Sequence, residues 1–237
     1  MDAGIRELER RWAITRAPDD EGRLLAARVR AGELRAESIQ LAACAGHTGA
    51  AAAAEVLEVQ AELDLVHAAA EAWPFSLEAR LRVALAALLA LLPAWDATES
   101  PAEVRSLPRD AARLVASILR AHEAGPREGD QEELRRLGEI ASDLTNGGQL
   151  TPEWSDGWSA SGVATLQATF FLLGALQAEG PASEQLVQED VGACLGSVLE
   201  GGPAVGEALR RKLLETIPGW ALGYDDPLIG DPDCGRG

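Results

Sequence analysis

The chain has 237 residues and a formal net charge of −17, and this length is enough to bury the core of one large or two small domains. The surplus of negative charge argues against nucleic acid as a partner, because phosphates are repelled. Three scattered cysteines are too few for a disulfide framework, so the composition favours a reduced, cytoplasmic protein.

Helical segments are predicted along almost the whole chain. β-branched and aromatic residues are scarce, and no stretch alternates between apolar and polar residues as a strand would. The amino-terminus is charged and amphipathic, unlike a signal peptide. Residues that typically start and stop helices recur along the rest of the chain, and together with the amino-terminal segment they predict about ten helices. After the amino-terminal segment, the predicted helices are 18–32, 36–46, 48–72, 76–93, 106–125, 130–146, 157–180, 183–201 and 203–216.

Short Gly- and Pro-containing connections favour antiparallel packing of neighbouring helices. We therefore predict an all-α fold, either an irregular multi-helix bundle or a HEAT-like stack of helical hairpins. The apolar stretches 83–93 and 163–178 are too short or too interrupted by polar residues to span a bilayer. Both are expected to be core helices, and no membrane partner is predicted.

The charge balance changes near the polar, helix-breaking segment 126–130. Residues 1–125 hold 14 basic and 19 acidic residues, whereas residues 126–237 hold 7 basic and 19 acidic residues. We predict an N-terminal helical region over 1–125 and an acidic helical region over 126–216, packed together as one globule. The last segment, 217–237, is predicted to be an irregular acidic tail.

The most one-sided segment runs from Leu137 to Leu209, where 73 residues contain no Lys or Arg. Its ten acids predict a negative face that attracts a cationic protein partner. Trp154 and Trp158 are predicted to lie in a polar loop of this segment, and aromatic side chains among acids are typical of a protein-binding surface. The predicted partner-binding residues are Glu153, Trp154, Asp156, Trp158, Glu184, Glu189 and Asp190.

Groups able to support catalysis or to bind a metal are few. Asp64, His67 and Glu71 could share one helix face as di-iron ligands do, but the chain has no second carboxylate–histidine pair of this kind. We interpret them as a solvated helix face. Cys44 and His47 have zinc-ligand spacing without the second cluster that a structural zinc site needs. Since nucleophile and phosphate-binding motifs are also absent, we predict no catalytic residue, no metal and no cofactor.

Three stretches of the chain carry a resemblance to known proteins. They are LERRW at 8–12 followed by RAGEL at 30–34, RVAL at 82–85 leading to LPAW at 92–95, and IPGWALG at 217–223. In this order and spacing they resemble a loose group of uncharacterised all-helical proteins common in myxobacteria, some of them similar to predicted immunity proteins of polymorphic toxin systems. The resemblance implies a soluble helical protein that binds another protein, and it assigns no functional residue.

Three functions are compatible with these patterns. The first is a non-enzymatic protein-binding module, such as an immunity or inhibitor protein that covers a basic surface of a nuclease-type toxin. The second is a structural or regulatory subunit of a larger assembly, in which acidity serves solubility. The third is a metal-dependent helical-bundle enzyme that uses Asp64, His67 and Glu71, for which too few ligands are present.

Overall fold

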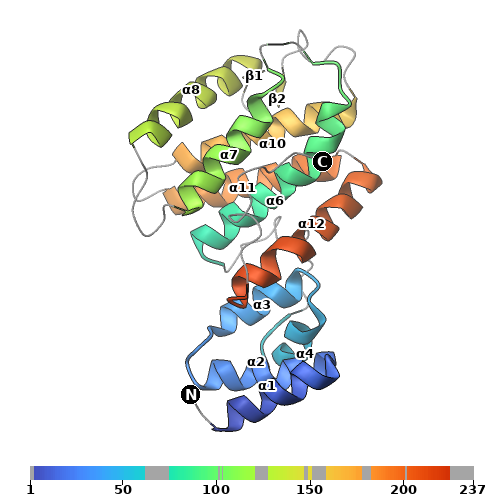
Figure 1. Ribbon diagram of the computed structural model, residues 1–237. Helices are drawn as coiled ribbons and strands as arrows, with labels where there is room; N and C mark the ends of the chain where they lie inside the picture. The colour runs from blue at the N-terminus through green and yellow to red at the C-terminus, as the bar shows by residue number, and fades with distance from the viewer. Residues whose placement is uncertain are drawn as a thin grey trace. The chain divides into compact units, whose positions relative to one another are not determined.

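Ten α-helices and one pair of two-residue antiparallel strands make up the described part of the protein (Figure 1). The computed structural model describes residues 3–61, 75–100, 102, 104–120, 128–146, 149–150, 159–177, 183–200 and 202–224. The strands are β1 Thr145–Asn146 and β2 Gln149–Leu150, with Thr145 opposite Leu150. The prediction of an all-α fold with about ten helices is confirmed.

The chain folds into two compact units. Unit 1 contains residues 1–68 and 213–227, and unit 2 contains residues 69–212 and 228–237. These units differ from the regions predicted from charge, because helices on both sides of residue 125 share one core in unit 2. Complementary apolar faces, rather than charge balance along the chain, decide which helices pack together.

Unit 1 is built from α1 Ala3–Thr15, α2 Pro18–Arg30, α3 Ala36–Cys44, α4 Thr48–Leu57 and the last part of α12 Pro203–Ala221. The first turn of α2 has proline at its start and three acids, which favour the positive end of the helix dipole. α2 buries Leu24 and Leu25 and packs closely on α4, where Gly22 lies against Ala52. α1 packs on α2, and α3 packs on α4, so α2 and α4 form the centre of this unit.

Unit 2 contains α6 Leu77–Asp96, α7 Leu107–Arg120, α8 Glu128–Leu144, α10 Ala160–Gln177, α11 Ser183–Glu200 and the first part of α12. α10 packs against α6, α7, α8 and α11, so the predicted apolar stretches both lie in core helices (Figure 1). Among the described helices, α10 alone is long and apolar enough to cross a membrane, and half of it is buried within the protein. Unit 2 therefore has one apolar central helix that holds the others in place.

The prediction of one continuous helix over 48–72 is wrong, because α4 ends at Leu57 and residues 58–61 are not helical, while residues 62–72 lie outside the described ranges. Glu58 adopts a left-handed backbone conformation with φ of 54°, and its N–H donates back to the carbonyls of Ala54 and Glu55. This cap ends α4 without glycine, whereas glycine is the residue that usually marks such an end in a sequence. The alanine-rich run therefore predicts the helix but not where it stops.

Two prolines lie inside helices, although Pro93 was predicted to end a helix and Pro218 to lie in the irregular tail. Pro93 falls within α6, which continues to Asp96, and Pro218 falls within α12, which continues to Ala221. Because proline has no backbone N–H, each of these helices loses one backbone hydrogen bond near its carboxyl end. Packing of the last turn offsets this loss. That turn is buried in both helices, through Trp95 in α6 and Ala221 in α12. The predicted irregular tail from residue 217 is therefore helical in its first five residues.

Candidate functional site

The structure describes two of the predicted partner-binding side chains. Glu189 and Asp190 are adjacent on α11, with Glu189 exposed and Asp190 half-buried. Glu184 also belongs to α11, but its side chain is outside the described part. The predicted residues that fall outside the described ranges are Glu153, Trp154, Asp156, Trp158, Asp64, His67 and Glu71.

Asp190 lies directly against the backbone of α10. A Cβ atom built on Gly174 would lie 2.9 Å from Oδ2 of Asp190 and 3.4 Å from its Cγ, so the carboxyl group occupies the space that a side chain would fill. In the described part of the chain, no hydrogen bond or ion pair involves this carboxylate. A half-buried charge without such a partner loses hydration and gains nothing in exchange.

Burial and a neighbouring charge act on Asp190 in the same direction. Loss of hydration raises the pKa of its carboxyl group, and the adjacent carboxylate of Glu189 raises it further. Neither helix of this hairpin supplies a compensating charge, because α10 contains no charged residue and α11 contains only acids. We call Glu189 and Asp190 the α11 acid pair.

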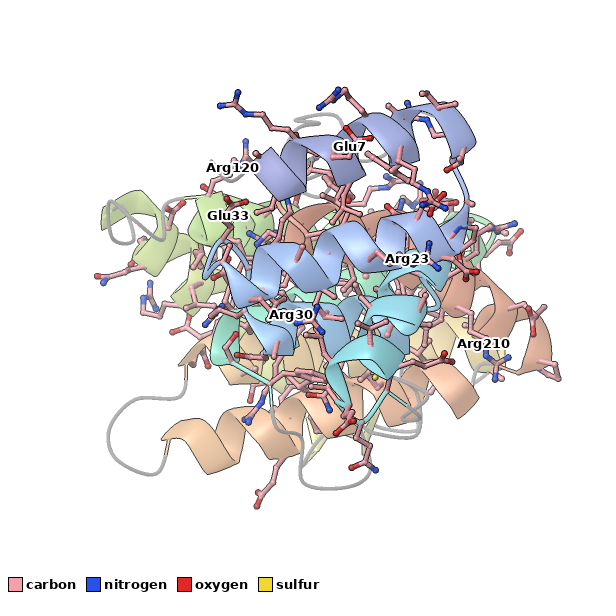
Figure 2. All side chains as sticks on the ribbon, turned by 90° about the horizontal axis from the view of Figure 1, so that it is seen from below. Glu7, Arg23, Arg30, Glu33, Arg120 and Arg210 are labelled. Carbon is pink, nitrogen blue, oxygen red and sulfur yellow. The ribbon has the colours of Figure 1, made fainter. Side chains whose placement is uncertain are left out.

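The charges of unit 1 and of α8 are arranged differently. Figure 2 shows side chains of both signs on unit 1, including Glu7, Arg23, Arg30 and Glu33. On α8, Arg135 pairs with Glu132 and Glu139 on neighbouring turns. Mixed signs of this kind compensate each other locally, as on an ordinary helical surface. The α10–α11 hairpin is thus distinguished by having charges of one sign only.

Cys194 lies one turn beyond Asp190 on α11. It is fully buried, and its Sγ is 4.0 Å from the carbonyl oxygen of Ala84 on α6. Burial raises the pKa of the thiol to about 12, and the charge of Asp190 adds to this shift. The thiol therefore stays protonated near neutral pH, and it fills core volume rather than acting as a nucleophile.

The carboxylate of Glu21 in unit 1 is also buried, but it has polar partners. Glu21 Oε1 accepts a hydrogen bond from the Tyr224 hydroxyl at 3.3 Å and lies 3.9 Å from Nε2 of His47. Its Oε2 rests against Gly49 in the first turn of α4, where the helix dipole favours negative charge. The ring of Tyr224 also stacks on Trp12 of α1, with 6.0 Å between the ring centres. These contacts tie the chain after α12 to the amino-terminal helices.

His47 serves as the N-cap of α4. Its Nδ1 accepts a hydrogen bond from the backbone N–H of Ala50 at 3.1 Å, so the proton of the neutral ring is assigned to Nε2. The nearby Cys44 thiol lies 3.9 Å from the carbonyl oxygen of Ala61 instead. Across the described ranges, no three His, Cys, Asp or Glu side chains are grouped closely enough to hold a metal ion.

Replacing His47 by alanine is expected to lower the free energy of unfolding of unit 1 by about 1 kcal/mol, because the first turn of α4 loses its cap. His47→Asn keeps a short side-chain acceptor and should recover most of this loss. Urea denaturation followed by circular dichroism measures both variants. If both substitutions lowered the free energy of unfolding equally, His47 would not stabilise the protein through its capping hydrogen bond.

An open groove of about 430 Å³ lies between α7, α8 and α10 in unit 2. Its lining residues are Ile118, Asp130, Gln131, Leu134, Arg135, Leu176 and Gln177. Two hydrogen bonds tie its walls, from Ser117 to Asp130 and from Gln177 to the carbonyl oxygen of Leu134, each at 3.3 Å. The volume is within the range of small-ligand sites, and the polar residues of its lining are Asp130, Gln131, Arg135 and Gln177.

No family model, no curated protein and no solved structure matches the chain. The chemistry of the described side chains is therefore the basis for a function. Of these side chains, Glu189 and Asp190 are the ones that sequence patterning predicted to bind a partner, from their charge. It missed Gly174, although an isolated glycine within a helical segment is a recognised sign of close packing.

Proposed function

We propose that this protein is a non-enzymatic protein-binding module that binds a cationic surface of its partner at the α10–α11 hairpin. The observation that carries the proposal is the half-buried Asp190 carboxylate, which has no hydrogen bond or ion pair in the described part and lies next to Glu189. A Lys or Arg side chain of a partner would stabilise both charges and donate a hydrogen bond to the Asp190 carboxylate. Acids whose pKa is raised by burial and a like charge are found at functional sites as well as in structural networks.

The charge of the whole chain supports the same partner chemistry. With a net charge of −17, the protein attracts a basic surface over long distances and speeds the encounter. The resemblance to predicted immunity proteins adds a class of partner, a toxin whose basic surface contacts nucleic acid. Binding of such a surface at the acid pair would block it without any chemical step.

Removing the charges of the acid pair is expected to weaken partner binding about tenfold or more, because charges that are partly buried in an interface are poorly screened by water. Partners are captured from native lysate on the wild-type protein, identified by mass spectrometry and purified. Their affinity is then measured for the double variant Glu189→Gln with Asp190→Asn. The association rate of the wild-type protein should also fall steeply as salt concentration rises.

The matched control is Glu55→Gln with Glu58→Gln, which changes the net charge by the same amount on exposed residues of α4 and its cap. This control should retain nearly wild-type affinity. Equal weakening by both double variants would assign binding to net charge alone and contradict a site at the acid pair. An association rate that does not respond to salt would contradict the electrostatic mechanism.

A further inference from the structure

Gly174 is the residue that allows Asp190 to be half-buried. The carboxylate of Asp190 would lie only 2.9 Å from a Cβ atom at this position, closer than real Cβ contacts allow. Glycine within a helix is about 1 kcal/mol less favourable than alanine, so its presence in the middle of α10 has a cost in stability. Any other residue at position 174 would displace the carboxylate from α10.

We propose that Gly174 positions the Asp190 carboxylate so that acidification removes one charge from the α11 acid pair and weakens its hold on a cationic partner. This inference rests on the function proposed above and adds a form of regulation to it. Gly174 acts through Asp190 and is therefore a positioning residue. Gly174 on α10 has no side chain, and the carboxylate of Asp190 on α11 occupies the space that a side chain would fill.

Among the described residues, the charged groups on the helices packed against α11 do not counteract this effect. α10 contains no titratable residue. α6, which also packs on α11, carries Glu78, Arg80, Arg82 and Asp96 as its charged residues. None of these four contributes to the raised pKa of Asp190, which results from burial first and from Glu189 second. On α11 itself, the titratable groups besides Asp190 are Glu184, Glu189, Glu200 and Cys194.

The direction of the pH dependence follows from the raised pKa of Asp190. The folded protein keeps this proton at a pH at which the unfolded chain has already released it. Stability therefore falls as the pH rises from the usual pKa of an aspartate through the higher pKa of the folded state. Partner binding changes in the opposite direction, because only the ionised carboxylate attracts a cation.

The positioning role of Gly174 is tested in the free protein by ¹³C NMR titration of the Asp190 side-chain carboxyl carbon. We expect Asp190 to titrate at a lower pH in Gly174→Ala than in the wild-type protein, because the added methyl group moves the carboxylate into water. Gly196→Ala adds the same methyl group to α11 in open space and should leave the titration unchanged. A wild-type midpoint at or below the usual value for aspartate would overturn the proposal even if Gly174→Ala does not fold.

Regulation of binding is tested with a tetramethylrhodamine-labelled hexa-arginine peptide between about pH 7 and about pH 4, a range that covers the ordinary titration of carboxylates. The affinity of the wild-type protein should fall at a higher pH than that of Gly174→Ala, and Asp190→Asn should lack this step. Identical profiles for the wild-type protein and Gly174→Ala would overturn the inference and leave the proposed function intact. Peptide binding that does not depend on the acid pair would contradict the proposed function, while the NMR titration would still report on Gly174.

Discussion

Replacing Gly22 by alanine is expected to lower the free energy of unfolding of unit 1 by about 2 kcal/mol, as overpacking outweighs the better helix propensity of alanine. A Cβ atom at this position would lie 2.7 Å from Cβ of Ala52 and 2.9 Å from the backbone nitrogen of Ala53. The obstacle is largely the backbone of α4, which cannot rotate away as a long side chain can. α2 and α4 would have to separate at the centre of the unit.

Hydrogen exchange of the amide groups in α2 and α4 measures this effect within unit 1, independently of unit 2. Exchange should become faster throughout both helices in Gly22→Ala. The control Gly196→Ala makes the same substitution on α11 of unit 2, where the added methyl group meets nothing within 4 Å, and it should leave exchange in α2 and α4 unchanged. Unchanged exchange in Gly22→Ala would show that the two helices are not in close contact.

Replacing Trp95 by alanine is expected to lower the free energy of unfolding by about 3–5 kcal/mol, the usual range for removing a buried tryptophan. Only 1% of Trp95 is exposed, and its indole N–H donates a hydrogen bond of 2.9 Å to the carbonyl oxygen of Arg105. The side chain thus fixes the end of α6 to the segment that leads into α7. Its loss would leave both a cavity and a carbonyl group without its donor.

The variant Trp95→Phe separates these two contributions. It keeps an aromatic ring in the core but removes the indole donor, and it should cost less than Trp95→Ala by at least about 1 kcal/mol. Urea denaturation followed by far-ultraviolet circular dichroism measures both variants. A loss below about 1 kcal/mol for Trp95→Ala would contradict the burial of this side chain.

Helix starts were predictable because their causes are local in sequence. Pro18 with the following acids begins α2, and the side chain of Ser76 caps α6 by accepting from the N–H of Ala79 at 3.4 Å. Helix ends were less predictable. α6 continues past Pro93, a residue that usually ends helices, because its last turn is buried. α4 ends before Glu58, which adopts the left-handed conformation that glycine usually provides.

Charge patterning pointed to Glu189 and Asp190 but could not distinguish between them. Both are acids on one helix of a segment without cations. Only the packing of α11 on α10 separates their roles, because Asp190 lies against Gly174 and Glu189 remains exposed. The contact between Tyr224 and Glu21 joins residues 203 positions apart, and no local pattern indicates it.

The sequence by itself determined the helical class, most helix starts and the single sign of charge over residues 137–209, because each depends on neighbouring residues or on composition. The tertiary structure decided which helices share a core and where two prolines are tolerated. It also decided that Asp190, and not Glu189, is half-buried and loses part of its hydration. Burial results from contacts between distant segments, and the pKa of Asp190 follows from that burial.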